Sequence, residues 1–359
     1  MVTFYRCGHG DCAMIDDVFN FNGHQEPVKL YIDLGRKSFA IPYNQNMSNA
    51  DLLITHSDND HCCGQASFLT PNRIFVPAFF VELEIILLKL HHHKNIGLLN
   101  HNNKGRFIPV EESRQLVYSP NLKWDVFNPV RNKWGKWVSS LSIPIDQLID
   151  SINGYLSDVQ VDLDVDGIIR SVRDARDYYI DRNSDVSDDE VWLFVIAVLY
   201  KVYCRSRKKK LTLTQAVNAF KCHDANEYSI VFKYIDSCGT SFLFTGDAPS
   251  EVYARSYTNK NVQARVLKVP HHGSATGIDI VNSVPPSSIA LNNIDPDFMV
   301  VSNANQNKTP PNVGVLNFLR NQPGKTLLMT NDFTKLAGAS FKGVSLPYSF
   351  PNGIQAKIV

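Results

Sequence analysis

The first 80 residues contain short runs of β-branched and aromatic residues that are separated by Gly, Asn and Pro. This pattern is typical of β-strands, and each run is followed by a polar residue. Residues 81–100 instead carry apolar side chains at helical spacing, which predicts a helix. The strands expected in this half of the chain cover residues 12–21, 28–35, 50–56, 114–120 and 122–129.

The pattern changes after about Val130, where apolar residues take helical spacing with charges on one side. Helices are expected at 146–159, 165–182, 188–210 and 212–220, and strands resume at 228–236, 240–247, 264–274, 297–307 and 326–332. The simplest interpretation is one β-rich α/β domain formed by residues 1–130 and 223–359. A helical insertion, residues 131–222, would interrupt it and act as a cap.

The composition narrows the class of protein. The chain has 359 residues, 44% of them hydrophobic, which is enough for a substantial core. A formal net charge of +1 gives no overall attraction to nucleic acid or to a membrane. Seven cysteines, two of them adjacent, do not suggest a disulfide scaffold. No signal peptide or membrane-spanning run is expected, and the predicted location is the cytoplasm.

Four potential metal ligands lie directly behind the apolar run at 50–56, in the segment THSDNDHCCG. In an extended segment His56, Asp58 and Asp60 would point to one side, and His61 can turn in where the chain bends. Imidazole and carboxylate together suit zinc, manganese or iron, and carboxylates favour the harder ions. One short stretch cannot saturate two ions, so further ligands are expected elsewhere.

Two later segments have the same layout, because each is an apolar strand that ends in a residue of ligand type. FLFTGDAPSE ends in Gly246 and Asp247, and VLKVPHHGS ends in His271 and His272. Ligands at the ends of several strands are a usual way to assemble a metal site.

In this order, THSDNDHCCG, FTGDA and LKVPHHGS resemble the motifs of the metallo-β-lactamase fold hydrolases, most closely the nuclease-like domain of competence DNA-uptake proteins. GHGDCAMI, LYIDLG and NEYSIVFKY are similar to other stretches of that group, and the likeness covers roughly 1–130 and 223–359. It implies an αββα sandwich with two mixed sheets face to face, and a hydrolase with two divalent ions, zinc or manganese, with magnesium as a further option.

The resemblance also implies a role for each motif residue. His56 and Asp58 would bind the first ion, Asp60 and His61 the second, Asp247 both, and His272 the second in preference to His271. Asp60, His61 and Asp247 would be catalytic, with Asp60 binding metal or accepting the proton of water. Asp33 and Asp11 would orient ligands. Asn226 stands where the superfamily often has a histidine, so it and His271 are weaker candidates.

The expected reaction is hydrolysis of a phosphodiester in DNA, RNA or a nucleotide, because two divalent cations neutralise phosphate charge well. Lys268, Ser274, Asn303 and Asn305 are candidates for holding the phosphate. The run RSRKKK and the segment Trp124 to Trp137 offer cations and aromatic rings, although helix ends and core packing explain them more simply. A lactone, thioester or β-lactam hydrolase, and a degenerate non-catalytic module, remain as alternatives.

Overall fold

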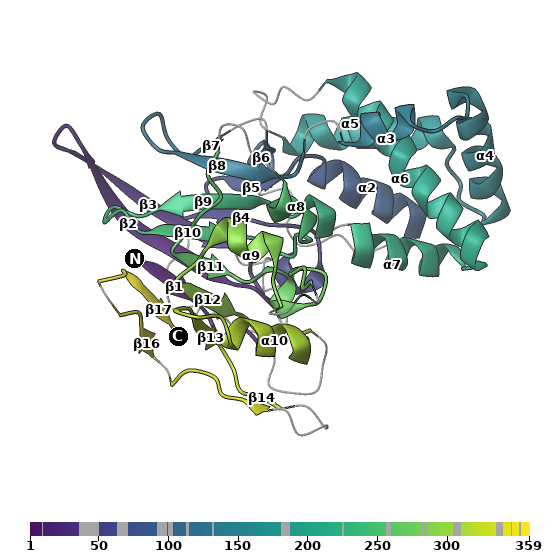
Figure 1. Cartoon of the computed structure of the whole chain (residues 1–359). Coiled ribbons are helices and arrows are strands. Elements are labelled where there is room, and N and C mark those ends of the chain that lie inside the picture. The colour runs from purple at the N-terminus through teal and green to yellow at the C-terminus, as the bar shows by residue number, and fades with distance from the viewer. Residues whose placement is uncertain are drawn as a thin grey trace.

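Two mixed β-sheets pack face to face in the computed structural model, and helices pack against their outer faces (Figure 1). This arrangement confirms the mixed α/β sandwich predicted from the sequence. The structure describes the chain apart from residues 9, 36–49, 63–70, 92–98, 100–102, 113–114, 131–132, 181–186, 225, 256–259, 282, 284–285, 304–309, 335–339, 346 and 352.

The first sheet has the strand order β16-β17-β1-β2-β3-β4-β5-β6, and its half from β3 to β6 is parallel. Parallel strands place their carboxyl ends at one edge, which is where ligands usually bind in such sheets. Its strands are β1 (Val2–Phe4), β2 (Ala13–Phe21), β3 (His24–Ile32), β4 (Asp51–Leu53), β5 (Ile74–Pro77), β6 (Phe107–Val110), β16 (Tyr348–Ser349) and β17 (Ala356–Ile358).

The second sheet has the order β13-β12-β11-β10-β9-β8-β7, and its half from β10 to β13 is parallel. Its strands are β7 (Leu116–Val117), β8 (Lys123–Asn128), β9 (Val231–Ile235), β10 (Ser241–Phe244), β11 (Val266–Lys268), β12 (Phe298–Val301) and β13 (Thr326–Met329). A small separate hairpin consists of β14 (Phe333–Thr334) and β15 (Ser340–Phe341).

The inner faces of the two sheets form one hydrophobic core. Leu30 and Leu53 of the first sheet and Phe232 and Phe244 of the second belong to the same buried cluster. The rings of Phe232 and Phe244 stack with centroids 5.2 Å apart. Because successive strand residues point to opposite faces, their neighbours in sequence are available to pack against the outer helices.

Two groups of helices pack against the sandwich, and most of the first group lies to one side of the strands (Figure 1). The first group is α2 (Phe80–His91) with α3 (Lys133–Ser139), α4 (Ile145–Asp158), α5 (Val165–Tyr179), α6 (Asp188–Lys209) and α7 (Leu213–Asp224), and it shares a cluster with Leu52 and Ile74 of the first sheet. The second is α8 (Glu251–Ala254), α9 (Ile289–Ile294) and α10 (Val313–Arg320), which packs on Leu243, Leu267 and Met299. The remaining short helices are α1 (Asn59–Cys62) and the 3₁₀ turns η4 (Asn226–Tyr228) and η5 (Pro270–Gly273).

The helices α3 to α7 all lie between β8 and β9, in the segment expected to be an insertion. They do not form an isolated unit, because they share their apolar cluster with α2 and the first sheet. The longest, α6, begins with a capping box in which Ser187 and Glu190 satisfy each other's backbone groups. None of the described helices combines the length and apolarity that crossing a membrane requires.

Where the structure describes them, the aromatic segment is engaged in packing, whereas most of the basic run lies exposed at the C-terminal end of α6. Trp124 is buried, and its ring stacks against Tyr118 and Phe232. The Arg205 guanidinium donates to the carbonyl of Ala219, and Arg207 pairs with Asp158. The core-packing interpretation of the Trp124 region is therefore the better one.

A buried ion pair joins α2 to α5. The Glu82 carboxylate, 2% exposed, accepts from Arg176 Nη1 at 3.0 Å. Burial raises the pKa of Glu82, and the charge of Arg176 only partly offsets this effect. Breaking such a pair on one side leaves a charge without its partner in a low-dielectric environment.

We therefore expect Arg176→Met to destabilise the protein by about 3–5 kcal/mol, because Glu82 would remain buried. Arg207→Met is the matched control, since the Arg207–Asp158 pair is exposed and should contribute about 0–1 kcal/mol. Urea denaturation measures both values. The double variant Glu82→Leu/Arg176→Met should recover most of the loss, and equal effects of the two single variants would contradict this assignment.

Candidate metal centre

The acidic and imidazole side chains of three distant motifs converge at the carboxyl ends of the parallel strands. Asp33 follows β3 and His56 follows β4 in the first sheet, whereas Asp247 follows β10 and His272 follows β11 in the second. The two sheets meet here through a backbone hydrogen bond of 2.9 Å from Ile230 N to Thr55 O. The site is therefore assembled from both layers of the sandwich.

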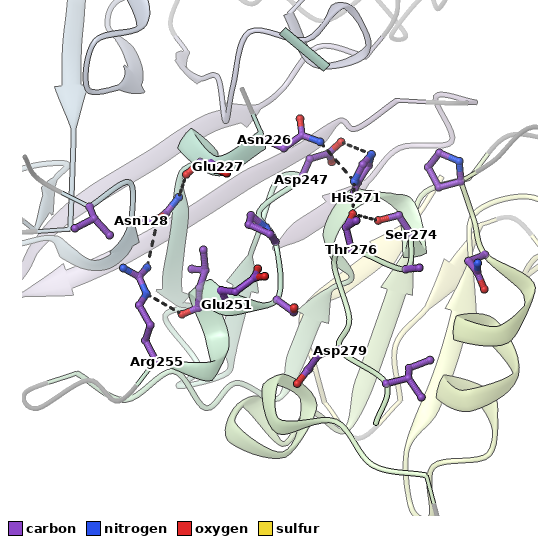
Figure 2. Close-up of a pocket in the computed structure, with 18 of the residues that line it drawn as sticks. Asn128, Asn226, Glu227, Asp247, Glu251, Arg255, His271, Ser274, Thr276 and Asp279 are labelled. Atoms are coloured by element: carbon purple, nitrogen blue, oxygen red, sulfur yellow. Dashed lines mark hydrogen bonds and ion pairs between the residues drawn. The ribbon is translucent and has the colours of Figure 1, made fainter. Parts of the chain in front are cut away.

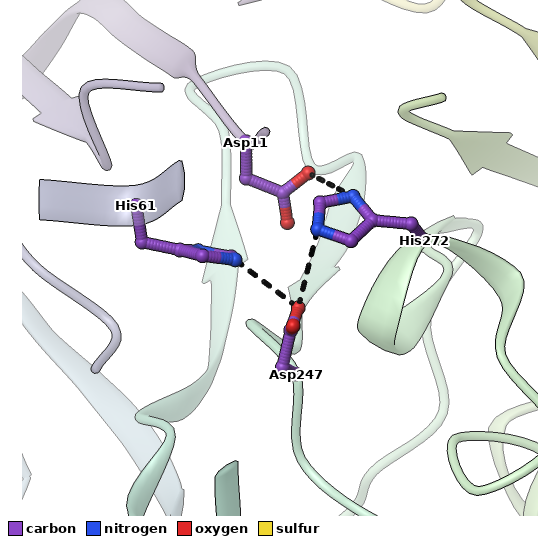
Figure 3. A group of neighbouring side chains, drawn as sticks. All are labelled: Asp11, His61, Asp247 and His272. Carbon is purple, nitrogen blue, oxygen red and sulfur yellow. Dashed lines mark ion pairs between the residues drawn. The ribbon is translucent and has the colours of Figure 1, made fainter. Parts of the chain in front are cut away.

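Asp247 lies at the centre of the cluster and faces histidines with both oxygens. Its Oδ1 is 3.3 Å from His61 Nε2 and 3.9 Å from His272 Nε2 (Figure 3). Its Oδ2 is 3.9 Å from His56 Nε2 and 3.6 Å from His271 Nε2. One carboxylate thus stands between two pairs of imidazoles, which is the geometry that a bridging ligand requires.

In three of these histidines the other ring nitrogen is occupied by an acceptor. His61 Nδ1 lies 2.8 Å from Asp33 Oδ2, and His272 Nδ1 lies 3.1 Å from the carbonyl oxygen of Ser302. His56 Nδ1 lies 3.1 Å from Thr55 Oγ1, which itself donates to Asp33. These contacts assign the proton to Nδ1, so each Nε2 directs a lone pair at the region around Asp247.

Two half-buried aspartates complete the two sides of the cluster. Asp58 Oδ2 is 3.8 Å from His56 Nε2, and Asp60 Oδ2 is 3.4 Å from His272 Nε2. Their side chains are 21% and 17% exposed, whereas the histidines they face are 1% exposed. The carboxylates of Asp58 and Asp60, together with the His271 ring, which is 25% exposed, are therefore the parts of the cluster that solvent reaches.

Asp11 lies close enough to the centre of the cluster to bind a metal ion directly, although the sequence suggested only that it would orient other ligands. It belongs, with His61, Asp247 and His272, to a buried group whose potential ligand atoms all lie within 4.8 Å of one another (Figure 3). Its Oδ1 is 3.5 Å from His272 Nδ1, and its Oδ2 is paired with the ammonium group of Lys268. Asp11 can therefore act as a ligand or as an orienting group.

Burial and charge act in opposite directions on these groups. Burial alone raises the pKa of Asp247, but the charges of His61 and His272 outweigh it and hold that pKa well below its ordinary value. Burial lowers the pKa of His61, but Asp247 and Asp33 outweigh it and raise that pKa well above its ordinary value. The carboxylates therefore require positive charge beside them, from protons or from metal ions.

The unsatisfied atoms of the cluster provide a direct test of whether a cation fits. His56 Nε2, His61 Nε2 and Asp247 Oδ1 are buried, and none has a hydrogen-bond partner among the described residues. A buried polar atom without a partner is costly, and these atoms converge on one another. Nitrogen and oxygen donors in this arrangement could hold a metal ion.

The turn that carries His271 and His272 has an unusual backbone. His271 has φ 48° and ψ 47°, and His272 has φ 51° and ψ 26°, so both residues are left-handed. This conformation costs roughly 1–2 kcal/mol per residue for side chains other than glycine. Such strain is typical of functional positions, and here it directs two adjacent imidazoles at the same carboxylate, Asp247.

Glycine is required at position 246. Gly246 has φ 49°, and a Cβ atom there would lie 2.8 Å from Thr55 Cβ and 3.0 Å from Ser229 Cβ. Because Gly246 has no side chain, the turn that follows β10 can contact Thr55, which follows β4. It also brings Asp247 N within 3.1 Å of Ser229 Oγ, which accepts its hydrogen bond.

Three residues proposed to hold a phosphate lie in different environments. Lys268 is 6% exposed, and its ammonium group pairs with the carboxylate of Asp11. It therefore compensates charge inside the cluster and does not line the cleft. Asn303 is fully buried and exchanges hydrogen bonds with Asn331. Ser274 lines the cleft, and its Oγ lies 2.9 Å from Thr276 Oγ1. The fourth, Asn305, lies outside the described residues.

Other contributors were not anticipated from the sequence. Thr55 binds Asp33 through its backbone N and its Oγ1, both at 2.7 Å, and so fixes Asp33 beneath His61. Ser229 and Ser302 position Asp247 and His272. Small polar residues at strand ends are common, so only the position of Thr55 directly before His56 could have drawn attention to it. Cys62 is buried and donates to Ser57 O, and Cys63 lies outside the described residues.

A cleft of about 1310 Å³ opens beside the cluster (Figure 2). Asp247, His271 and Asn226 form one part of its wall, and Lys136 of α3 contributes from the helical segment. The described lining also includes acidic residues and one further cation, namely Glu227, Glu251, Asp279 and Arg255. The candidate metal centre therefore has an open approach that the helical segment borders.

No protein-family model matches the chain, and a search of curated proteins found no match.

We expect Gly246→Ala to destabilise the protein more than Gly105→Ala. Both glycines have positive φ, but a Cβ at Gly105 would meet nothing within 4 Å, so Gly105→Ala isolates the backbone cost of roughly 1–2 kcal/mol. Overpacking against Thr55 should add about 1–3 kcal/mol in Gly246→Ala. Thermal and urea denaturation provide the comparison, and equal losses would show that the contact with Thr55 relaxes freely.

Asp33→Asn should weaken metal binding by about 10–100-fold, because the amide cannot orient His61 as the carboxylate does. Asn tolerates the left-handed backbone of Asp33, whose φ is 57°, so the turn should persist. Competition with a chromophoric chelator measures the affinity. Asp17→Asn removes another buried carboxylate of the first sheet, one that binds Tyr234 and Ser237, and should leave metal affinity unchanged.

Proposed function

We propose that the protein is a metal-dependent hydrolase of the metallo-β-lactamase type that cleaves phosphodiester bonds. The observation that carries the proposal is the position of Asp247, whose two oxygens face two different pairs of histidine Nε2 atoms. A carboxylate that joins two groups of ligands supports a pair of ions. The αββα arrangement and the strand-end position of the ligands agree with the resemblance seen in the motifs.

The residues fall into two ligand groups around this carboxylate. His56 and Asp58 lie on the Oδ2 side, and Asp60, His61 and His272 lie on the Oδ1 side. Two divalent ions bound there would neutralise the charge of a phosphodiester and lower the pKa of a water molecule. Asp58 and Asp60 are the most exposed members, so they are placed to accept the proton of that water.

Phosphodiester hydrolysis is preferred over hydrolysis of a carbonyl compound because of the carboxylates. Asp58, Asp60 and Asp247, with Asp11 nearby, give more oxygen donors than a zinc-only site needs. Such donors suit manganese and other hard ions, which commonly bind phosphate oxygens. The site therefore fits a substrate that presents charged oxygen atoms.

Within this class the charges of the cleft favour a small substrate. Its described lining carries three acidic residues, Glu227, Glu251 and Asp279, against two cations, Lys136 and Arg255. Of these cations, Arg255 is engaged by Glu112 and the carbonyl of Phe127. A long polyanion would meet this acidic wall, whereas a nucleotide keeps most of its charge at the metal centre. We therefore place a nucleotide or another small phosphodiester ahead of a DNA or RNA strand.

Asp247→Ala should abolish turnover and bound metal together, because one carboxylate serves both groups of ligands. Elemental analysis of metal-loaded protein and hydrolysis of bis-p-nitrophenyl phosphate measure the two effects. Asp297→Ala, which removes an exposed partner of Arg265, is the control and should keep both. Full activity in Asp247→Ala would refute the catalytic assignment.

A substrate panel separates the candidate reactions. With manganese or zinc, we expect cleavage of bis-p-nitrophenyl phosphate and of cyclic dinucleotides, weaker cleavage of single-stranded DNA and RNA, and none of nitrocefin or a lactone. Cleavage of only the last two would support a carbonyl hydrolase instead. Protein that binds no metal and cleaves nothing would support the non-catalytic module.

A further inference from the structure

His271 lies in the wall of the cleft, on the side of Asp247 opposite to His61 and His272. Its Nε2 is 3.6 Å from Asp247 Oδ2, and its side chain is 25% exposed (Figure 2). The same oxygen of Asp247 lies 3.9 Å from His56 Nε2. His271 therefore approaches the side of Asp247 that also faces His56 and Asp58.

We propose that His271 supplies a ligand to the first ion and so replaces the histidine that the superfamily often has where this chain has Asn226. The proposal rests on the two-ion site proposed above and deepens it. It changes the assignment made from the sequence, in which only the second histidine of the pair bound metal. The adjacent residues His271 and His272 would then serve different ions.

The distances on this side suit atoms that share one cation. Ligand atoms about 2.0–2.2 Å from a tetrahedral ion lie roughly 3.3–3.6 Å from one another. His271 Nε2 and Asp247 Oδ2 are 3.6 Å apart, and His56 Nε2 is 3.8 Å from Asp58 Oδ2. Small side-chain shifts would therefore bring these four ligand atoms within bonding distance of one shared cation.

The surroundings of His271 fix the ring in the required orientation. Its Nδ1 lies 3.2 Å from Thr276 Oγ1 and 3.5 Å from Asn226 Nδ2, so Nε2 is the nitrogen that faces Asp247. Thr276 is itself held by Ser274, at 2.9 Å. The backbone N of His271 donates to Gly246 O at 3.1 Å, which ties this turn to the turn that carries Asp247.

Asn226 is better placed to support His271 than to bind metal. Its amide group is a weak ligand, and its Nδ2 lies 3.5 Å from Nδ1 of His271. Metal binding through Nε2 requires the proton on Nδ1, which Thr276 Oγ1 can accept. A rotation of the Asn226 amide by 180° would turn its Oδ1, which is buried without a hydrogen-bond partner among the described residues, toward Nδ1 as a second acceptor that orients the ring. The left-handed backbone at both histidines is what lets consecutive side chains reach opposite oxygens of one carboxylate.

The test compares metal stoichiometry in His271→Asn, His272→Asn and Asn226→Ala. Asn is chosen because it tolerates the left-handed backbone that both histidines adopt, so folding should survive. Protein loaded with zinc or manganese and passed through a desalting column is analysed for metal and by circular dichroism. We expect two equivalents in the unmodified protein and in Asn226→Ala, and one in each histidine variant.

Cobalt spectroscopy adds a readout that does not depend on activity. Cobalt-loaded His271→Asn should lose one set of visible bands, and His272→Asn the other, because each variant empties a different site. If His271→Asn binds two equivalents of metal with unchanged affinity, this inference is overturned and the proposed two-ion function remains intact. One equivalent or none in the unmodified protein would instead refute the two-ion site.

Discussion

The contact between Thr55 and the turn formed by Gly246 and Asp247 holds the site together, because it joins the two sheets where the ligands emerge. A Cβ at position 246 would lie 2.8 Å from Thr55 Cβ, and Thr55 O accepts a hydrogen bond from Ile230 of the second sheet. Thr55 also fixes Asp33, which orients His61. Every ligand therefore depends on how closely these two strand ends approach.

The sequence predicted the parts of this arrangement that are encoded locally. Apolar strands followed by polar residues led to β4, β10 and β11, and to His56, Asp247 and His272 at their ends. Helical periodicity between β8 and β9 predicted α4 to α7. Both predictions succeed because the spacing of apolar residues within a segment indicates whether that segment is a strand or a helix. The terminal strands β16 and β17 are too short to give such a signal.

Other parts depend on tertiary structure and could not be predicted from the sequence. Lys268 was a candidate for holding the phosphate, yet it is buried against Asp11. The opposite directions of His271 and His272 arise from a left-handed turn, which no local pattern of Pro-His-His-Gly announces. Asp11 reaches the cluster only because β2 begins beside the end of β3.

Charge balance links the fold to the proposed chemistry. Among the described residues, the cluster gathers five carboxylates, Asp11, Asp33, Asp58, Asp60 and Asp247, against one ammonium group, that of Lys268. With neutral histidines this leaves four uncompensated negative charges, and most of the groups are buried, where such charge is costly. Protons on His61 and His272, whose pKa values are raised by these aspartates, compensate part of it. Two divalent cations carry four positive charges, so they would balance the cluster and leave every histidine free to bind them through Nε2.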